Sequence, residues 1–395
     1  MQCFHLTSSR FFGGPERQML ELGKAVAPAI GSTFVSFSET GLCRAFLDAV
    51  GREGFDAVAL RHDTPRLAAA ARELEAVLRA GKADVLCCHG YKADLLGLVA
   101  ARRSGIPVIA VSRGWTAETA RVRLYEALDR RVLARMDRVV CVSEAQAERV
   151  RRVGVLASKV VVIRNAIRVE RFERPVDGYR SRLQGLFRSP RRWIVGAAGR
   201  LSPEKGFAFL VDAAAEVLTR TPEAGFAVFG EGALRDSLEQ RIAARRLAGR
   251  FALAGFRPDF DAYVPHLDLL VLSSLTEGLP NVAIEALAAG VPVVATNVGG
   301  TGEAVSDGED GVLVPPGDPH ALAKAICELL AADEVRCRMG IVGRRRMRRQ
   351  FSFAAQAAGY RRLFAQLGVG RLGEEPQGGN GCGAWQVSGR AARGQ

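Results

Sequence analysis

The sequence predicts an α/β protein of two domains, each built on a parallel sheet with helices on its faces. Apolar runs alternate with helical patterns throughout the first half, and the second half repeats the scheme. Such alternation is typical of parallel strands joined by crossover helices. The chain has 395 residues, 48% of them hydrophobic, which exceeds what one core usually accommodates. We therefore expect two domains with a cleft between them.

The predicted strands are short apolar runs. In the first half they are Cys3 to Ser8, Thr33 to Phe37, Ala57 to Leu60, Val85 to Cys88, Val108 to Val111, Val139 to Val142 and Val160 to Ile163, and in the second half they lie near Trp193, Phe226, Phe251, Leu269, Val293 and Val312. Arg174-Pro175 and the polar stretch Asp177 to Pro190 resemble a linker. We place the first domain at residues 1–172 and the second at 173–349.

The segment Glu277 to Glu285 carries two carboxylates eight residues apart. It follows the predicted buried strand Leu269 to Ser274, and Asn281 is expected to cap a helix over Val282 to Ala289, which Gly290 ends. The amides at a helix start are unpaired and carry partial positive charge, so they suit a phosphate or diphosphate. Glu285, one turn into the helix, is able to accept hydrogen bonds from a ribose. Glu277, in the loop, is free to meet a sugar hydroxyl.

A basic loop lies upstream in the same predicted domain. Gly199-Arg-Leu-Ser-Pro-Glu-Lys-Gly206 directly follows the predicted strand Trp193 to Ala198. A glycine-opened loop at a strand end is able to bring Arg200 and Lys205 to the two phosphates of one nucleotide-sugar. Arginine offers a planar fork and lysine a point charge.

These segments resemble the retaining glycosyltransferases of family 4 (glycosyl transferases group 1), which have the GT-B fold of two facing Rossmann-like domains. Glu277 and Glu285 match the glutamate-x7-glutamate signature of that family. Further matches in the expected order are Gly230-Glu-Gly232, Gly255-Phe256-Arg257, and Gly290 to Thr296 leading into Gly299-Gly300. The resemblance covers nearly all of residues 193 to 332.

The resemblance implies sugar transfer from a nucleoside-diphosphate sugar to an acceptor hydroxyl with retention of configuration, in cell-surface polysaccharide, lipopolysaccharide or glycolipid biosynthesis. It assigns catalytic roles to His89, Arg200, Lys205 and Glu277. The residues expected to bind the nucleotide-sugar are Gly13, Gly14, Gly199, Arg200, Lys205, Gly230, Phe256, Arg257, Glu277, Gly278, Leu279, Pro280, Asn281, Val282 and Glu285. The expected acceptor is a glycan or a lipid-linked glycan.

The first domain carries less specific signals. Phe11 to Glu16 follows the first strand and resembles the glycine-rich loop of the family, in which Gly13 and Gly14 let the backbone approach donor phosphates or acceptor. The loop is not a dinucleotide G-x-G-x-x-G, which counts against an oxidoreductase. His89 lies just past a strand end and either faces the donor sugar, as the resemblance suggests, or is a structural hydrogen-bonding group.

Three other segments are noted near predicted strand ends. Ser112 to Trp115 either lines the acceptor side or is an ordinary loop, and Ser143 is expected to cap a helix. Family members usually have asparagine-glycine and then an acidic residue where this chain has Asn165, Ala166 and Arg168. The departure puts in doubt any contact of the missing carboxylate near the interdomain hinge.

We expect neither a catalytic metal nor a cofactor. Asp259-Phe-Asp261 matches a metal-binding D-x-D pattern, but it starts a short predicted helix (Asp259 to His266), where acidic side chains act as caps. The eight cysteines lack metal-ligand spacing and are expected to be core residues in a reducing compartment. Arg200, Lys205 and a helix N-terminus suffice to offset the diphosphate charge.

The net charge of +13 raises the question of nucleic acid or membrane partners. The densest cluster, Arg344 to Arg349, is interpreted first as a solvated helix face, second as a contact with anionic lipid, and only third as a nucleic-acid site. No aromatic stacking platform supports the last, so nucleic acid is not expected as a partner. We find no membrane-span length and no secretory signal, and expect a cytoplasmic protein, with peripheral contact with the inner face of the membrane as a further option.

The C-terminal part has two predicted segments. Phe351 to Leu367 favours a helix, which in this family crosses back over the first domain (residues 350–368), and residues 369–395 are expected to be a disordered tail. Alternatives to a transferase are a non-catalytic nucleotide-sugar-binding regulator, a sugar-nucleotide epimerase or phosphorylase-like enzyme of the same fold, and a nucleic-acid-binding protein. Donor identity, acceptor identity and oligomeric state are not predicted.

Overall fold

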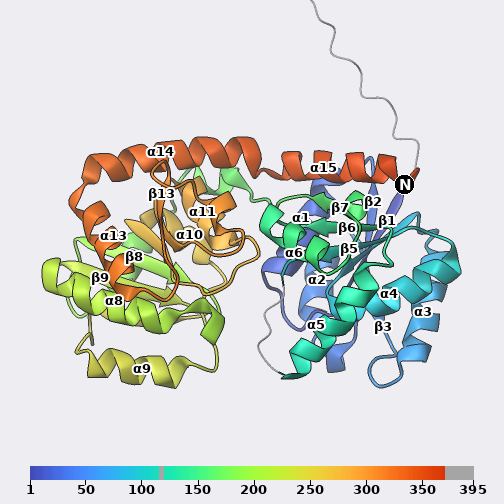
Figure 1. Cartoon of the computed structure of the whole chain (residues 1–395), viewed down its shortest axis with the longest axis horizontal. Coiled ribbons are helices and arrows are strands. Elements are labelled where there is room, and N and C mark those ends of the chain that lie inside the picture. Colours follow the sequence, from blue (N-terminus) through green and yellow to red (C-terminus); the bar gives the residue numbers. More distant parts are fainter. Residues whose placement is uncertain (115–119, 370–395) are drawn as a thin grey trace, which may run out of the picture.

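The protein forms two lobes that lie side by side and are bridged along one edge by two long helices (Figure 1). The structure is a computed structural model, and it describes residues 1–114 and 120–369. The predicted tail lies outside the described residues except for Val369, as does Trp115 at the end of the segment considered for the acceptor side.

The N-terminal lobe is built on a seven-stranded parallel sheet in the order β3-β2-β1-β4-β5-β6-β7. Its strands are β1 (Gln2–Thr7), β2 (Gly31–Phe37), β3 (Asp56–Leu60), β4 (Val85–His89), β5 (Val108–Ser112), β6 (Arg138–Cys141) and β7 (Val160–Val162). Its helices are α1 (Gly14–Val26), α2 (Arg44–Arg52), α3 (Leu67–Ala80), α4 (Tyr91–Ser104), α5 (Ala120–Leu133) and α6 (Glu144–Arg152), with 3-10 turns η1 (Glu39–Gly41), η2 (Ala157–Lys159) and η3 (Val169–Phe172).

The C-terminal lobe repeats this architecture with a six-stranded parallel sheet in the order β10-β9-β8-β11-β12-β13. Its strands are β8 (Trp193–Ala198), β9 (Ala224–Phe229), β10 (Phe251–Gly255), β11 (Leu269–Leu272), β12 (Val293–Thr296) and β13 (Gly311–Val314). Its helices are α7 (Tyr179–Gln184), α8 (Phe207–Arg220), α9 (Arg235–Ala244), α10 (Phe260–Tyr263), α11 (Asn281–Ala289), α12 (Thr301–Ala304), α13 (Pro319–Ala331) and α14 (Asp333–Gln350), with 3-10 turns η4 (Pro203–Lys205) and η5 (Val264–His266).

Both strand orders are those of a doubly wound sheet, in which the order reverses beside the first strand. Ligands of such sheets bind at the carboxyl ends of the strands near that reversal, here next to β1 and β4 in one lobe and β8 and β11 in the other. The predicted α/β class and the predicted strands are therefore confirmed, and the two switch points mark where a site is expected.

The stretch between the lobes is more structured than the sequence suggests. The polar segment predicted as a linker contains α7, whose Leu183 is fully buried and whose Tyr179 packs edge-to-face on Tyr263 at 4.7 Å between ring centroids. The prediction of a linker over this helix is wrong because a few apolar side chains spaced along a polar segment are enough to dock it on the core.

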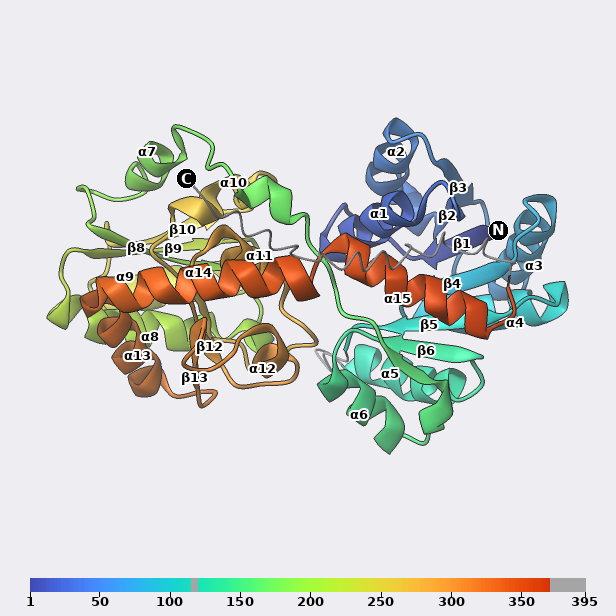
Figure 2. The ribbon, with the colours of Figure 1, turned by 90° about the horizontal axis from the view of Figure 1, so that it is seen from above.

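The helices α14 and α15 (Phe353–Gln366) run along the outside of both lobes (Figure 2). Helix α15 crosses to the N-terminal lobe, where Tyr360, Leu363 and Phe364 join a buried cluster with Leu22 and Val26 of α1. The Ser352 hydroxyl caps this helix by accepting a hydrogen bond from the amide of Ala355. The crossing segment thus ties the two lobes together by burying apolar surface.

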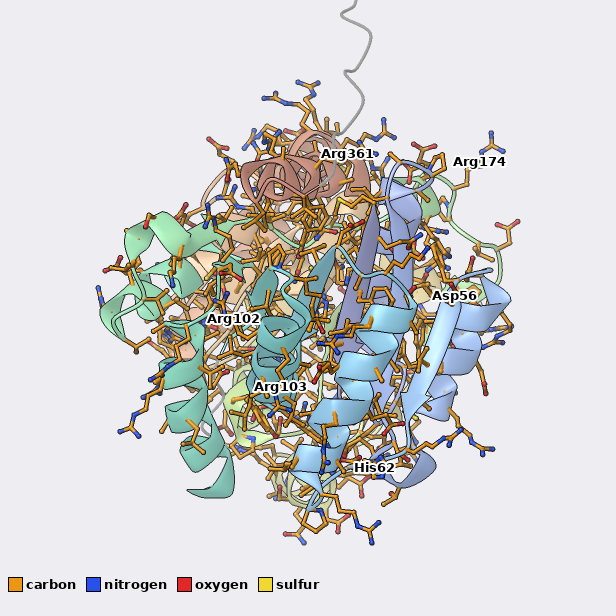
Figure 3. All side chains as sticks on the ribbon, turned by 90° about the vertical axis from the view of Figure 1, so that its right-hand side faces the viewer. Asp56, His62, Arg102, Arg103, Arg174 and Arg361 are labelled. Atoms are coloured by element: carbon orange, nitrogen blue, oxygen red, sulfur yellow. The ribbon has the colours of Figure 1, made fainter. Side chains whose placement is uncertain are left out.

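The arginine cluster on α14 is not simply a solvated face. Arg344 donates to the carbonyl of Ala289 at 2.6 Å, and Arg346 pairs at 2.6 Å with Asp310, which is fully buried. The interpretation as a solvated face is wrong for these two side chains, because Arg344 bonds to the carbonyl end of α11 and Arg346 pairs with a buried carboxylate. Other basic residues lie elsewhere, with Arg102 and Arg103 on α4, Arg361 on α15 and Arg174 in the segment before α7 (Figure 3).

No helix in the described ranges combines the length and the apolar composition needed to cross a bilayer.

Candidate active site

The loops at the carboxyl ends of β8, β9 and β10 are locked together by close backbone contacts. The amide of Gly199 donates to the carbonyl of Phe229 at 3.0 Å, and that of Gly230 donates to Gly255 at 3.0 Å. A Cβ atom on Gly230 would lie 1.9 Å from the carbonyl oxygen of Gly199, so only glycine fits there. This packing holds the loop that carries Arg200 and Lys205 at the edge of the sheet.

Lys205 connects this loop to the one that precedes α11. Its Nζ lies 2.6 Å from Oε1 of Glu277, and the Ser274 hydroxyl donates to the same oxygen at 2.7 Å. The Glu277 side chain is 10% exposed. The first glutamate of the predicted pair is thus held by a cation and a hydroxyl, and both contacts use the same carboxylate oxygen.

Helix α11 begins one residue earlier than predicted. Pro280 is the residue before the helix, and no side chain caps it, so the prediction that Asn281 is the cap is wrong. The reason is a competing partner, because Oδ1 of Asn281 accepts a hydrogen bond from Nδ2 of Asn165 at 2.8 Å. Leu279 and Pro280 are buried, and the Pro280 carbonyl accepts from the amides of Ala283 and Ile284. Gly290 ends the helix in the left-handed conformation, as predicted.

The start of α1 faces the start of α11 across the two lobes. A Cβ on Gly14 would lie 3.5 Å from Nδ2 of Asn281. Gly13 precedes α1, and its amide donates to the Glu16 carboxylate at 3.1 Å. Helix N-termini carry partial positive charge, so two of them meeting at one place favour an anion.

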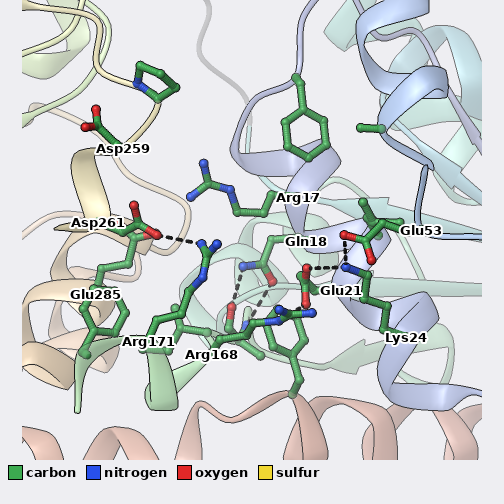
Figure 4. A pocket seen from close by; sticks show the side chains of 18 of the residues that line it. Arg17, Gln18, Glu21, Lys24, Glu53, Arg168, Arg171, Asp259, Asp261 and Glu285 are labelled. Atoms are coloured by element: carbon green, nitrogen blue, oxygen red, sulfur yellow. Dashed lines mark hydrogen bonds and ion pairs between the residues drawn. The ribbon is translucent and has the colours of Figure 1, made fainter. Parts of the chain in front are cut away.

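Glu285 lies in a cavity of about 630 Å³ between the lobes, with Arg17, Arg171 and Asp261 among the residues around it (Figure 4). Burial raises the pKa of Glu285 to about 7, although Arg17 and Arg171 oppose the shift. Pro258 also lines this cavity. The exposed Phe256 and Arg257, predicted for the nucleotide base, therefore sit in the loop at its edge.

The two acidic residues of the D-x-D pattern have other partners than the helix start. The Tyr179 hydroxyl donates to Asp259 at 2.8 Å, and Asp261 pairs with Arg171 at 2.7 Å. Asp259 is the residue before α10 and Asp261 lies in its first turn, as predicted for the start of this helix. The Asp259 side chain does not cap the helix, because it bonds to Tyr179 of α7 instead.

The hinge residues that depart from the family pattern are held by α1. Gln18 donates to the carbonyl of Ala166 at 2.5 Å and accepts from its amide at 3.0 Å. Arg168 pairs with Glu21, which also contacts Lys24 at 3.3 Å. The cation that replaces the usual acidic residue is thus matched by an acid on the facing helix (Figure 4).

His89, the last residue of β4, is enclosed by two other side chains. Its Nδ1 lies 3.1 Å from a guanidinium nitrogen of Arg113, and its Nε2 lies 3.2 Å from Nδ1 of His5. Arginine only donates, so Nδ1 accepts, and Nε2 carries the proton that points to His5. Burial, with Arg113 and His5 nearby, holds the pKa of His89 well below its ordinary value. His89 is therefore a neutral ring with a protein partner on each nitrogen.

Behind this pair of histidines, Cys3, His5 and Cys87 bring their ligand atoms within 4.8 Å of one another. The spacing along the chain gave no sign of this cluster because neighbouring strands β1 and β4 supply it. A hydrogen bond to Cys87, then burial, raises the pKa of Cys3. The Cys3 and Cys87 sulfurs lie 3.7 Å apart in the core.

A second, larger cavity of about 920 Å³ lies at the carboxyl ends of the N-terminal strands. His89 lines it together with Arg200 of the other lobe. Among its lining residues, Lys92 contacts Glu39 at 2.7 Å and also pairs with Asp63. The structure thus brings two of the predicted catalytic residues, one from each lobe, to a single hollow.

The lobes touch through backbone and side-chain contacts beside the predicted donor loop. The Ser143 hydroxyl caps α6, as predicted, and also donates to the carbonyl of Gly278 at 2.8 Å. A Cβ on Gly278 would lie 2.0 Å from the carbonyl oxygen of Arg113. Glu303 accepts from the amide of Ala145 at 3.1 Å and pairs with Arg164 at 3.0 Å.

Sequence reasoning missed the contacts made by Arg113, Ser143 and Glu303 between the lobes. From the sequence, Ser143 was predicted only as a helix cap, and Arg113 only as part of the segment from Ser112 to Trp115. Glu303 lies in the four-residue helix α12, just after Gly299-Gly300. No local pattern links these residues, because each depends on a partner in the other lobe or on another strand.

Comparison with known families matches both lobes. The family described as Glycosyltransferase Family 4 matches residues 12–171, and the one described as Glycosyl transferases group 1 matches residues 192–332. The 2-deoxystreptamine glucosyltransferase of Streptomyces kanamyceticus is 30% identical over 286 residues, which cover 67% of this chain and 72% of that protein. The chain belongs to the family 4 glycosyltransferases.

Other similar proteins agree with this assignment. The UDP-Gal:alpha-D-GlcNAc-diphosphoundecaprenol alpha-1,3-galactosyltransferase of Escherichia coli is 26% identical over 261 residues, covering 63% of this chain and 67% of that protein. The crystal structure of Anabaena HepE in complex with UDP-glucose has a TM-score of 0.81 at 20% identity and covers 93% of this chain and all of that one. The family 4 chain described above is thus a glycosyltransferase with the GT-B fold.

Proposed function

We propose that this glycosyltransferase moves a sugar from a nucleoside-diphosphate sugar to an acceptor hydroxyl with retention of configuration, in the synthesis of a cell-surface polysaccharide, lipopolysaccharide or glycolipid. The observation that carries the proposal is the meeting of two helix starts, at Gly14 and Asn281, across the lobes. Together with the basic loop of Arg200 and Lys205, they suit a diphosphate. The names of the galactosyltransferase and of the UDP-glucose complex above support the donor class.

In the proposed reaction, the bond between the anomeric carbon and the diphosphate oxygen breaks while the acceptor oxygen bonds to that carbon on the same face. The acceptor proton passes to the departing phosphate oxygen, so the step needs no separate base. Arg200, Lys205 and the backbone N–H groups of Leu279, Asn281 and Val282 offset the charge that develops on the diphosphate. A metal ion is not part of the proposal.

Glu285 is proposed to hold the ribose, since it lies one turn into α11 in the cavity beside the Phe256–Arg257 loop. Glu277 is proposed to orient the donor sugar through the oxygen that Lys205 and Ser274 do not use. His89 is proposed to shape the sugar site as a neutral ring. Its two protein partners favour a fixed orientation over direct proton transfer.

The large cavity argues against an epimerase, which acts on the nucleotide-sugar alone and has no use for a second substrate site. Donor hydrolysis distinguishes an enzyme from a regulator that binds nucleotide-sugar without turnover. We expect slow release of free sugar and nucleotide from the correct donor in the absence of an acceptor. A protein that binds the donor but releases nothing would overturn the catalytic proposal.

The donor is best identified by thermal stabilisation. A ligand that binds only the folded state raises the Tm, so UDP-, GDP- and ADP-sugars are to be compared at equal concentration. We expect one base to raise the Tm clearly, and Lys205→Ala to reduce that rise. Absence of a shift for the whole panel would contradict a nucleotide-sugar site.

A further inference from the structure

The cavity of about 920 Å³ in the N-terminal lobe has a feature that sugar binding does not explain. Leu67, Tyr91, Leu95 and Leu128 all line it, and they are 38%, 42%, 40% and 44% exposed. Large apolar side chains gathered at one exposed place mark a binding surface more often than chance exposure does. The cavity therefore has an apolar wall open to a ligand.

The apolar wall continues along one face of α4. Tyr91, Leu95 and Val99 are spaced four residues apart, so they line up on one side of the helix, and Val99 is also exposed. The row extends about 12 Å along the helix axis. Leu128, on the neighbouring α5, faces the same cavity. The wall is thus a strip that leads away from the site, rather than an isolated spot.

Much of the remaining lining of this cavity is polar. His89 ends β4 just before α4 begins, so the row on α4 leads away from it, and Arg200 and the charged group of Lys92, Glu39 and Asp63 add hydrogen-bonding atoms. Backbone strain accompanies this polar lining, because Glu39 and Thr40 have φ values of 45° and 58°. Strain of this kind is maintained where surrounding structure enforces it, often at ligand sites.

We propose that the acceptor is amphipathic, with its reacting hydroxyl at the His89–Arg200 end and an alkyl or polyprenyl chain along Leu95, Val99 and Leu128. This inference rests on the proposed function and names the acceptor class of the same site. A plain oligosaccharide fits less well, because sugars are held by flat aromatic faces and polar side chains. The exposed wall has one aromatic residue, Tyr91, and otherwise aliphatic ones.

The strip is assigned to the chain of the acceptor rather than to a membrane surface. A membrane contact needs apolar side chains that protrude together, whereas Leu67, Leu95 and Leu128 line a hollow that also holds His89 and Arg200. A chain attached to the acceptor would enter the hollow with its hydroxyl leading. Each methylene that it buries is expected to tighten binding about twofold to fourfold, where fourfold corresponds to about 0.8 kcal/mol.

The test uses n-alkyl glucosides from methyl to decyl, each below its critical micelle concentration, as soluble probes of this surface. Binding is measured by calorimetry with and without UDP, on the full chain. The affinity of the wild type for the glucoside should rise about twofold to fourfold with each added methylene, over the first several methylenes of the series. The variant Leu95→Gln/Leu128→Gln should lose most of this dependence, because it keeps helix-favouring residues but removes the apolar wall.

Leu156→Gln is the matched control, since Leu156 is 65% exposed and lies outside both cavities described above. It should keep the wild-type dependence on chain length. The inference is overturned if the wild type shows no such dependence, or if the double variant keeps it while circular dichroism shows both proteins folded.

Vesicle binding and donor hydrolysis distinguish this inference from a membrane contact and from the proposed function. Co-sedimentation with phosphatidylglycerol vesicles that is lost in the double variant, while its alkyl-glucoside affinities stay unchanged, would overturn the inference in favour of a membrane contact. The calorimetry does not depend on turnover. Absence of donor hydrolysis in the wild type would therefore count against the proposed function alone, and absence of the chain-length effect against the acceptor class alone.

Discussion

The two lobes share one architecture but hold their functional groups in different ways. In the C-terminal lobe, backbone atoms do most of the positioning, as in the contact between Gly199 and Gly230. In the N-terminal lobe, side chains do it: Arg113 and His5 enclose His89, and Lys92 joins Glu39 to Asp63. Backbone positioning suits the diphosphate common to all donors, whereas side chains are easily exchanged for each new acceptor.

The strongest test of this contrast is Lys205→Ala, alone and with Arg200→Ala. Removing a cation that offsets charge on the leaving diphosphate should lower kcat by about 10²-fold to 10³-fold. The fold should persist, since Lys205 is a loop residue whose main contact is Glu277. Steady-state kinetics and circular dichroism check this.

Lys324→Ala is the control for that test, because Lys324 is exposed on α13 and pairs only loosely with Glu328, at 3.9 Å. It should transfer sugar at the wild-type rate. Near-normal turnover by Lys205→Ala and Arg200→Ala would remove both residues from the proposed role.

Gly278→Ala tests the contact between the lobes. The new Cβ would meet the carbonyl oxygen of Arg113 at 2.0 Å, so the lobes would have to separate. A shift of about 1 Å at a reacting centre costs up to about a hundredfold in rate, and we expect a fall in kcat of about tenfold to a hundredfold. Small-angle X-ray scattering with UDP bound should show a larger radius of gyration than that of the wild type.

The control here is Gly51→Ala at the end of α2, where an added Cβ meets nothing within 4 Å. Kinetics and scattering of that variant should match the wild type. If Gly278→Ala keeps both the rate and the compact form, the closed arrangement of the lobes is not the reacting one.

The contrast between the lobes also explains which features were predictable from sequence. The parallel sheets and the loops of Arg200 and Glu277 are local, since each lies within a few residues of an apolar strand. The linker over α7 and the cap at Asn281 were predicted wrongly because distant partners decide them, namely Tyr263 and Asn165. Local patterns carry no information on such partners.

The same reasoning applies to the N-terminal site. His89 could be predicted as a site residue because it follows the predicted strand Val85 to Cys88. Its neutral state, however, depends on His5 of β1 and on Arg113 in the loop after β5. Likewise, the apolar wall of the cavity joins side chains of α3, α4 and α5. Only the folded arrangement brings these residues together.

Arg113→Met sharpens the comparison by removing one enclosing side chain of the N-terminal lobe. Without this cation, the pKa of His89 should move up from its lowered value, so the ring would take a proton as the pH falls. We expect kcat to fall about tenfold at most at neutral pH, with a further loss on acidification that the wild type lacks. The pH dependence of kcat and histidine NMR signals test this.

Arg113→Lys is the conservative variant, since lysine keeps a donor and a charge but not the planar fork. It should restore most of the wild-type kcat, and its kcat should not show the further loss on acidification. A purely structural role for Arg113 would instead lower the Tm of both variants and leave the shape of the pH profile unchanged.

The smallest expected effect concerns Glu285, whose pKa is raised from 4.5 to about 7 by burial. Below pH 7 the carboxyl is mostly neutral, and above it the charged form prevails, which accepts ribose hydroxyls better. The KM for the donor should therefore fall about threefold to tenfold from pH 6 to pH 8 in the wild type, following the ionised fraction of Glu285.

Glu285→Gln should have a weaker affinity for the donor that does not vary over this pH range, whereas Glu328→Gln, on the exposed face of α13, should behave like the wild type. A sloping KM in Glu285→Gln would assign the pH dependence to another group. A flat KM in the wild type would mean that the carboxyl is already ionised when ribose binds, because Arg17 of the N-terminal lobe offsets the effect of burial.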